Sequence, residues 1–183
     1  MSTIKIACVG DSITFGYDIQ EAHKWTTLLR NELQVEVLNF GINGDTTNGM
    51  LSRFNEVLFE NPSLIIVTGG TNDLWYGLKD EQIIANINAM VKHAQHQDID
   101  CLVGIPTPNF SLNAVNLVDE DYAECIRSFQ NRLIKFCLLK EISYIDFSLG
   151  MKEAHYFDDG LHPNVEGQQV MMLNALNVLK KII

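Results

Sequence analysis

Residues 63–73 read SLIIVTGGTND, and they carry the strongest indication of the fold class. The apolar run Leu64 to Val67 is typical of a strand buried on both faces, because a strand with one exposed face alternates apolar and polar residues. Two glycines and a polar triplet follow at once, which indicates a turn directly after the strand. The segment therefore predicts a central strand of a parallel sheet with polar groups at its carboxyl end.

Apolar runs of this kind recur along the chain and alternate with amphipathic segments. The predicted strands are Thr3 to Val9, Gln34 to Phe40, Ser63 to Thr68, Ile99 to Pro106 and Glu141 to Phe147. The predicted helices are 22–33, 46–58, 80–97, 119–139 and 164–182. Such alternation predicts parallel strands joined by right-handed crossovers, with helices on both faces of one sheet. We expect an α/β fold, a three-layer α/β/α sandwich with a flavodoxin-like five-stranded parallel sheet.

Nothing in the sequence divides the chain, since it has no internal repeat, low-complexity segment or linker. We therefore expect residues 1–183 to form one domain. One longer stretch, about 106–118, lacks regular signals and contains two prolines. We expect it to form a wall or lid of a pocket, with Phe110, Leu112 and Val115 covering part of a substrate.

The composition of the chain restricts the classes of molecule that it can bind. The chain is 46% hydrophobic and 20% charged, with a formal net charge of -10, which disfavours nucleic acid and anionic membrane surfaces and favours a small neutral molecule. No apolar run approaches the roughly 20 residues that span a bilayer, and the start of the chain lacks the apolar stretch of a secretory signal. We expect no membrane insertion and a cytoplasmic location. The four cysteines lack CxxC spacing, so we expect neither disulfides nor a metal, and we expect no cofactor.

Polar motifs follow four of the predicted elements. They are Gly10-Asp11-Ser12, Gly44-Asp45-Thr46, Gly70-Thr71-Asn72-Asp73 and Asp159-Gly160-Leu161-His162. The carboxyl ends of parallel strands lie at one edge of a sheet, where ligands bind. We therefore expect the four motifs to meet there.

In this order, the four motifs resemble the signature blocks of the GDSL/SGNH hydrolases, and the resemblance covers the whole chain. Ile13 replaces the leucine that usually follows the serine, which conserves volume. The resemblance implies a serine esterase in which Ser12 is the nucleophile and Asp159 and His162 complete a catalytic triad. It also implies an oxyanion hole formed by the Ser12 amide, Gly44 and Asn72.

The chemistry of these residues agrees with that implication. A serine hydroxyl becomes a nucleophile when a neutral imidazole takes its proton, and a carboxylate fixes the tautomer of that imidazole. We expect hydrolysis of small neutral carboxylic acyl esters through an acyl-enzyme. An acyltransferase, a thioesterase or a lysophospholipase would use the same triad. A non-catalytic flavodoxin-like binding module is disfavoured, because the chain has neither a phosphate loop nor a G-x-G-x-x-G motif.

Several of these residues also have purely structural explanations. Ser12 and Asn72 are residue types that cap helices, and Gly44 suits a turn with positive φ. Asp158 adjoins Asp159 and competes with it as the triad acid, and Asp146 is a third choice. Two further acids of the motifs, Asp11 and Asp73, are expected to brace their turns by accepting backbone hydrogen bonds.

The surroundings of the motifs suggest how a substrate is held. Aromatic residues flank the strand ends, and we expect Phe15, Trp75, Phe110 and Tyr156 to line an apolar pocket together with neighbours such as Tyr17. A set of acidic residues is expected at the rim, where it would disfavour anionic groups: Asp18, Glu21, Asp45 and Asp73. His93 and His96 have metal-ligand spacing but no third ligand nearby, so we interpret them as part of an exposed helix face.

Overall fold

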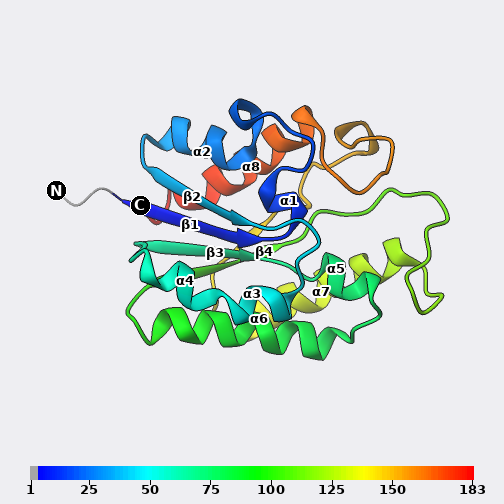
Figure 1. Cartoon of the computed structure of the whole chain (residues 1–183), viewed down its shortest axis with the longest axis horizontal. Coiled ribbons are helices and arrows are strands. Elements are labelled where there is room, and N and C mark those ends of the chain that lie inside the picture. Colours follow the sequence, from blue (N-terminus) through cyan, green and yellow to red (C-terminus); the bar gives the residue numbers. More distant parts are fainter. Residues whose placement is uncertain (1–3) are drawn as a thin grey trace.

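The computed structural model describes residues 4–183, which form a parallel five-stranded sheet with helices on both faces (Figure 1). The strands lie in the order β2-β1-β3-β4-β5. Their bounds are β1 Lys5–Gly10, β2 Glu36–Gly41, β3 Leu64–Thr68, β4 Asp100–Ile105 and β5 Tyr144–Asp146. This confirms the expected α/β/α sandwich with flavodoxin-like order. From β1 the chain adds β2 on one side and then β3 on the other, so the strand order reverses between β1 and β3, which is where such sheets bind ligands.

The helices form one layer on each face. One layer contains α1 (Ser12–Phe15), α2 (Trp25–Leu33) and α8 (Val165–Leu179), and the other contains α3 (Thr47–Ser52), α4 (Phe54–Phe59), α5 (Thr71–Trp75), α6 (Asp80–Gln95) and α7 (Tyr122–Lys140) (Figure 1). Two short 3-10 turns, Glu21–His23 and Glu153–His155, complete the elements.

Alternation of side chains in the buried strands builds a separate core on each face. In β1, Ile6 and Cys8 pack into the core under α2 and α8, whereas Ala7 and Val9 pack into the core under α3, α6 and α7. β3 is buried along its whole length. Because both faces are covered, the central positions of these strands are apolar on both faces, which is why their sequences form continuous runs.

Some element boundaries differ from those expected. The predicted helix 46–58 is two helices that meet at Arg53. The second strand begins at Glu36 and not at Gln34, because Gln34 ends α2 in the left-handed conformation with φ 55°. The fifth strand pairs over three residues only, and part of the predicted first strand, Thr3, lies outside the described residues.

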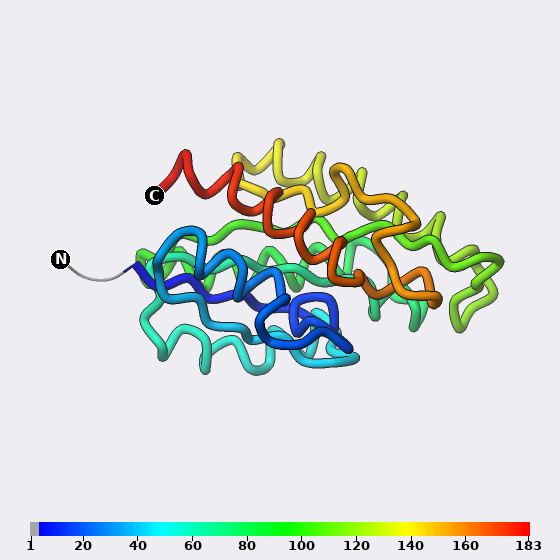
Figure 2. Tube along the Cα trace, turned by 90° about the horizontal axis from the view of Figure 1, so that it is seen from above, coloured from blue at the N-terminus to red at the C-terminus, as the bar shows by residue number. Residues whose placement is uncertain are grey.

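The connection between β5 and α8 and the loop 106–118 lie at the same end of the molecule (Figure 2). Two hydrogen bonds join them: the Phe110 amide donates to Gly160 O over 2.7 Å, and Ser111 Oγ donates to Asp159 O over 2.5 Å. Gly160, with φ 66°, packs so closely on this loop that a Cβ would overlap its backbone. The loop that carries Asp159 is thereby fixed by the loop 106–118. Within residues 4–183, no helix has the length and apolar character that a membrane crossing requires.

Candidate active site

Ser12 is the first residue of α1 and follows the end of β1 with one residue between. Asp11 caps this short helix, since its Oδ1 accepts a hydrogen bond of 2.9 Å from the Ile13 amide. The helix ends at Gly16, whose φ of 80° is left-handed. Gly10 has no room for a Cβ, which would overlap the Thr14 side chain. Small residues and a local cap therefore allow the sharp turn that presents Ser12 at the sheet edge.

Ser12, His162 and Asp159 form a continuous hydrogen-bonded chain. Ser12 Oγ lies 3.0 Å from His162 Nε2, and His162 Nδ1 lies 2.6 Å from Asp159 Oδ2. The other carboxylate oxygen of Asp159 accepts from the amides of Leu161 and His162. With the imidazole proton on Nδ1, His162 donates to Asp159 and its Nε2 accepts from Ser12. This arrangement can take a proton from Ser12 and stabilise the resulting imidazolium.

Asp159 is suited to remain ionised. Its partial burial favours the neutral acid, but the hydrogen bonds from the His162 ring and from the His162 and Leu161 amides outweigh that effect and lower its pKa below the ordinary value. The competing acids are placed differently. The His162 ring is bonded to Asp159 and not to the exposed Asp158, and Asp146 accepts from the amide and hydroxyl of Ser148.

Tyr17 covers the imidazole. Its ring centroid lies 4.4 Å from that of His162, with the two planes tilted by 33°. The Tyr17 amide donates to Ser12 O over 3.0 Å, so the backbone of Ser12 anchors the residue that packs against His162. The sequence placed Tyr17 among the aromatic residues near the strand ends, but gave no sign of this contact, because His162 lies far along the chain.

The other two expected donors follow β2 and β3. Gly44 has a φ of 76°, and a Cβ built on it would meet no atom of residues 4–183 within 4 Å. Asn72 is in the first turn of α5, and its Nδ2 donates to Asp45 O over 2.8 Å. An amide group carries two N–H donors, and within the described residues this one has a single acceptor, so it can donate to a ligand as well.

Two acidic residues of the motifs are buried. Asp11 braces its own turn as expected, whereas Asp73 bonds to Thr47, accepting from its amide and, over 2.6 Å, from its hydroxyl. Burial raises the pKa of Asp11 to about 7, against the opposing effect of the Ile13 amide, and burial likewise raises the pKa of Asp73. Asp73 therefore ties α5 to α3.

The expected acidic rim is partly wrong. Asp73 is fully buried and lies away from any rim. Asp45 is neutralised by Arg53, whose Nη2 lies 2.8 Å from its carboxylate, and Glu21 pairs with Lys24 over 3.1 Å. Asp18 is exposed as expected.

A cavity of about 750 Å³ lies beside Asp159 and contains two of the four expected substrate-binding aromatics. Phe110 and Tyr156 meet edge to face at 5.1 Å there, although Tyr156 is almost wholly buried. The remaining lining residues are Ser111, Leu112, Glu153, Ala154, Phe157, Asp158, Asp159 and Gly160. Three of the lining residues are acidic, whereas Ser12 and His162 are not among the lining residues.

The other two expected aromatics make different contacts. The Phe15 ring lies under Lys24, with Nζ 4.4 Å from its centroid, and Trp75 packs against Tyr122 at 5.2 Å. Loop 106–118 contributes Phe110 and Leu112 to the cavity wall, whereas Val115 is half exposed.

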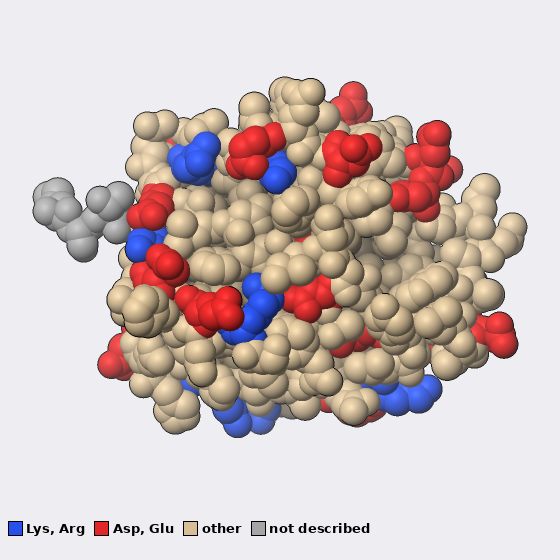
Figure 3. Space-filling model, in the orientation of Figure 1, with Lys and Arg blue, Asp and Glu red and all other residues tan. Residues whose placement is uncertain are grey.

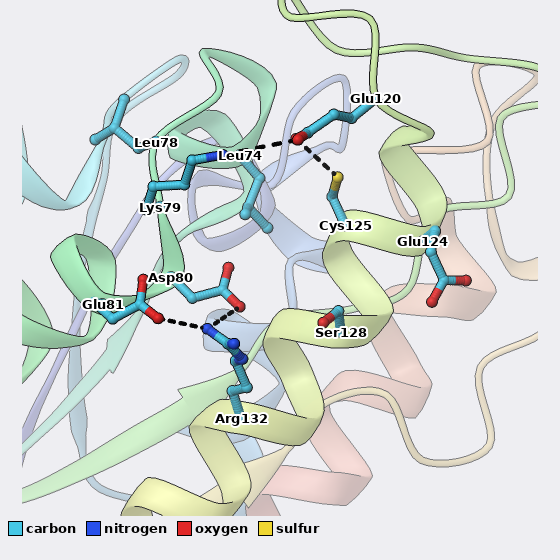
Figure 4. Close-up of a pocket in the computed structure, with 10 residues that line it drawn as sticks. All are labelled: Leu74, Leu78, Lys79, Asp80, Glu81, Glu120, Glu124, Cys125, Ser128 and Arg132. Carbon is cyan, nitrogen blue, oxygen red and sulfur yellow. Dashed lines mark hydrogen bonds and ion pairs between the residues drawn. The ribbon is translucent and has the colours of Figure 1, made fainter.

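A second cavity, of about 410 Å³, lies between α7 and the segment that joins α5 to α6 (Figure 4). Ion pairs cross it: Arg132 lies 2.7 Å from Glu81 and 3.4 Å from Asp80. None of its lining residues belongs to the hydrogen-bonded chain of Ser12, His162 and Asp159. Its lining carries four carboxylates, of Asp80, Glu81, Glu120 and Glu124, and two cations, of Lys79 and Arg132, which pair with three of them.

Charged side chains are dispersed over the surface, with acidic ones in excess and no basic patch on the face shown in Figure 3. His93 and His96 are exposed on or next to α6. Among residues 4–183, no group of three or more His, Cys, Asp or Glu is placed to hold a metal ion.

The comparisons with known proteins show the family of the chain. A sequence model of the GDSL-like lipase/acylhydrolase family matches residues 8–170. The chain belongs to this family. It is a carboxylic ester hydrolase of the GDSL type, and not the non-catalytic module considered above.

Relatives of this GDSL hydrolase match along most of its length. It is 28% identical over 173 residues to an arylesterase of Vibrio mimicus, covering 90% of this chain and 82% of the relative. It is also 28% identical to esterase TesA of Pseudomonas aeruginosa, covering 96% of this chain and 87% of the relative. The solved structure of a lipolytic protein of the G-D-S-L family from Desulfitobacterium hafniense matches with a TM-score of 0.83 at 26% identity, covering 95% of this chain and 98% of that chain.

Proposed function

We propose that this hydrolase cleaves small neutral carboxylic esters with Ser12 as nucleophile, His162 as general base and acid, and Asp159 as the triad acid. The observation that carries the proposal is the continuous chain from Ser12 Oγ through His162 to Asp159, with distances of 3.0 and 2.6 Å. Nucleophilic catalysis by serine requires a base bonded to the hydroxyl and an acid bonded to that base, and these three residues make those contacts.

In the first half of the reaction, Ser12 Oγ attacks the ester carbonyl carbon while its proton passes to His162 Nε2. The carbonyl oxygen becomes an oxyanion, to which the Ser12 amide, the Gly44 amide and Asn72 Nδ2 donate hydrogen bonds. The bond to the alcohol oxygen then breaks, and His162 returns its proton to that oxygen. Asp159 remains ionised throughout and stabilises the imidazolium.

In the second half, water attacks the acyl group on Ser12. His162 takes one proton of the water and then donates it to Ser12 Oγ as the acid leaves, which restores the enzyme. An alcohol in place of water would make the reaction an acyl transfer, and a thiol leaving group would make it a thioesterase reaction. Aryl esters are included in the proposal, since a relative is named arylesterase.

Replacement of Ser12 tests the proposal directly. We expect Ser12→Ala to abolish hydrolysis of p-nitrophenyl acetate while its circular dichroism spectrum and melting temperature match the wild type. A serine-reactive phosphonate should add once, at Ser12, as mass spectrometry of peptides can show. A folded and active Ser12→Ala protein, or phosphonate on another residue, would refute the assignment.

A matched pair of variants tests which aspartate is the triad acid. Asp159→Asn removes the carboxylate that contacts His162, whereas Asp158→Asn changes an exposed neighbour. We expect the first to lower kcat by about 10⁴-fold, as for loss of a triad acid, and the second to leave kcat within about threefold. A greater loss in Asp158→Asn would show that Asp158 is the triad acid.

A further inference from the structure

We infer that Arg53 is a positioning residue for the oxyanion hole, because its guanidinium joins the segments that carry the Ser12 and Gly44 amides and binds Asp45, whose carbonyl holds Asn72. The inference rests on the proposed roles of Ser12, Gly44 and Asn72. Arg53 itself lies where α3 and α4 meet, away from the reacting atoms. It would act through the groups it holds.

The guanidinium binds three acceptors from different segments. Nη2 donates to Gly10 O at the end of β1 over 3.2 Å and to Phe40 O in β2 over 2.9 Å. Nε donates to the carboxylate of Asp45 over 2.9 Å, and Nη2 lies 2.8 Å from the same oxygen. The side chains of Arg53 and Asp45 are only 13% and 11% exposed. Water therefore competes little for these contacts.

Two of the three acceptors, Gly10 O and the Asp45 carboxylate, are linked to proposed donors. Gly10 O belongs to the peptide that leads into Asp11 and Ser12, so its orientation affects the direction of the Ser12 amide. Asp45 follows Gly44 directly, and its own carbonyl accepts from Asn72 Nδ2 over 2.8 Å. A shift of Asp45 would thus move both the Gly44 amide and the Asn72 side chain.

The surroundings of Asp45 are built to hold its carboxylate. The other oxygen accepts from the Thr46 amide over 2.9 Å, and Gly49 in α3 lies against it so closely that a Cβ would overlap the carboxylate. Arginine suits this site, since its planar fork reaches several acceptors at fixed angles, which a lysine ammonium on a flexible stem cannot reproduce. The helix break at Arg53 directs this fork to the strand ends.

The test compares Arg53→Lys with Arg132→Lys, which makes the same change in an ion pair at the second cavity (Figure 4). We expect Arg53→Lys to lower kcat for p-nitrophenyl acetate by about 10- to 100-fold with KM within about threefold, since small misplacement of catalytic groups has effects of this size. Binding of phenylboronic acid, which forms a tetrahedral anionic adduct with an active-site serine, should weaken by a similar factor. Arg132→Lys should match the wild type in both.

Asn72→Ala, measured alongside, separates the inference from the function it rests on. If Asn72→Ala loses activity and Arg53→Lys keeps wild-type kcat and boronate affinity, Arg53 does not position the hole. If Asn72→Ala is fully active, the proposed oxyanion hole itself is wrong. If Arg53→Lys does not fold, Asp45→Asn takes its place, since it keeps the Asp45 carbonyl and removes the charge. A variant with lower melting temperature but unchanged kcat per folded molecule would assign a purely structural role and overturn the inference.

Discussion

At the scale of single residues, replacement of Asn72 measures how much one hydrogen-bond donor contributes to catalysis. Its amide is already oriented by Asp45 O, so little reorganisation is needed when an oxyanion forms. We expect Asn72→Ala to lower kcat by about 10²- to 10³-fold with little change in KM. Steady-state kinetics with p-nitrophenyl acetate measures this, and Asn86→Ala, which removes an amide that bonds to Thr47 and Asn48, is the matched control. An unchanged kcat would make Asn72 a structural residue of α5.

The buried carboxyl of Asp11 predicts a pH effect on stability. Its pKa rises from 3.8 to about 7 through burial, so the folded protein retains the proton over a range where the unfolded chain has released it. The free energy of unfolding should therefore fall as the pH rises from about 4 to 7, and the loss is complete above about 7. The Asn side chain keeps an acceptor for the Ile13 amide without a charge.

We accordingly expect Asp11→Asn to match the wild type in unfolding free energy near pH 4 and to exceed it at pH 8, by on the order of 1–4 kcal/mol. Urea denaturation at the two pH values measures the difference. Equal effects of the substitution at both values would contradict the assigned burial of a neutral acid.

At the scale of elements, Gly49 makes α3 dependent on a contact outside it. Alanine normally stabilises a helix interior by about 1 kcal/mol relative to glycine. Here a Cβ would overlap the Asp45 carboxylate, so that gain should be reversed. We expect Gly49→Ala to lower the melting temperature by several degrees and to reduce kcat. Ser52→Ala, at an exposed position of the same helix, should change neither, and a stabilised Gly49→Ala protein would show that Asp45 moves freely.

The sequence predicts an element well when the residues of that element alone determine it. It does not predict features that involve contacts with residues far along the chain. The run Leu64 to Val67 indicates a buried strand by itself, and the alternation of strands and helices was enough for the sheet and its two helical layers. The break in the helix 46–58 occurs at Arg53, whose guanidinium contacts Gly10 and Phe40. No local pattern signals such a contact.

The same reasoning applies to the candidate site. The four motifs indicated which residues meet, because the ends of parallel strands share an edge. The sequence does not indicate the burial or the ion pairing of the acidic residues. Asp45 and Asp73 are predicted as exposed acids, but in the structure they bind Arg53 and Thr47. The contact of Tyr17 with His162 likewise requires the folded chain.

At the scale of the whole molecule, we propose that short connections limit the size of the substrate. Each buried CH₂ contributes roughly 0.8 kcal/mol, but only where the protein encloses it, and Leu112 at the cavity wall is 87% exposed. We expect the highest kcat/KM for neutral acetyl to hexanoyl esters and a decline by lauroyl and palmitoyl. We expect Glu153, Asp158 and Asp159, which line the cavity, to disfavour anionic groups in place of Asp45 and Asp73. Rates that rise steadily through palmitoyl would contradict this.

The two cores share one sheet, and on that basis we propose that residues 1–183 unfold as one domain. The strands contribute alternate side chains to both cores, so neither core can persist without the sheet. We expect coincident urea transitions when helix content and ester hydrolysis are followed together. Two separated transitions would indicate two independent units.

The contact between Ser12 and His162 joins residues 150 positions apart. A chain in which only the first three strands have formed lacks His162 at the sheet edge and has no general base. During refolding, only fully folded molecules therefore hydrolyse a chromogenic ester, whereas partly folded chains also contribute to the circular dichroism signal. The delay of recovered activity behind recovered helix signal measures the lifetime of intermediates in which the last strand and helix have not yet docked.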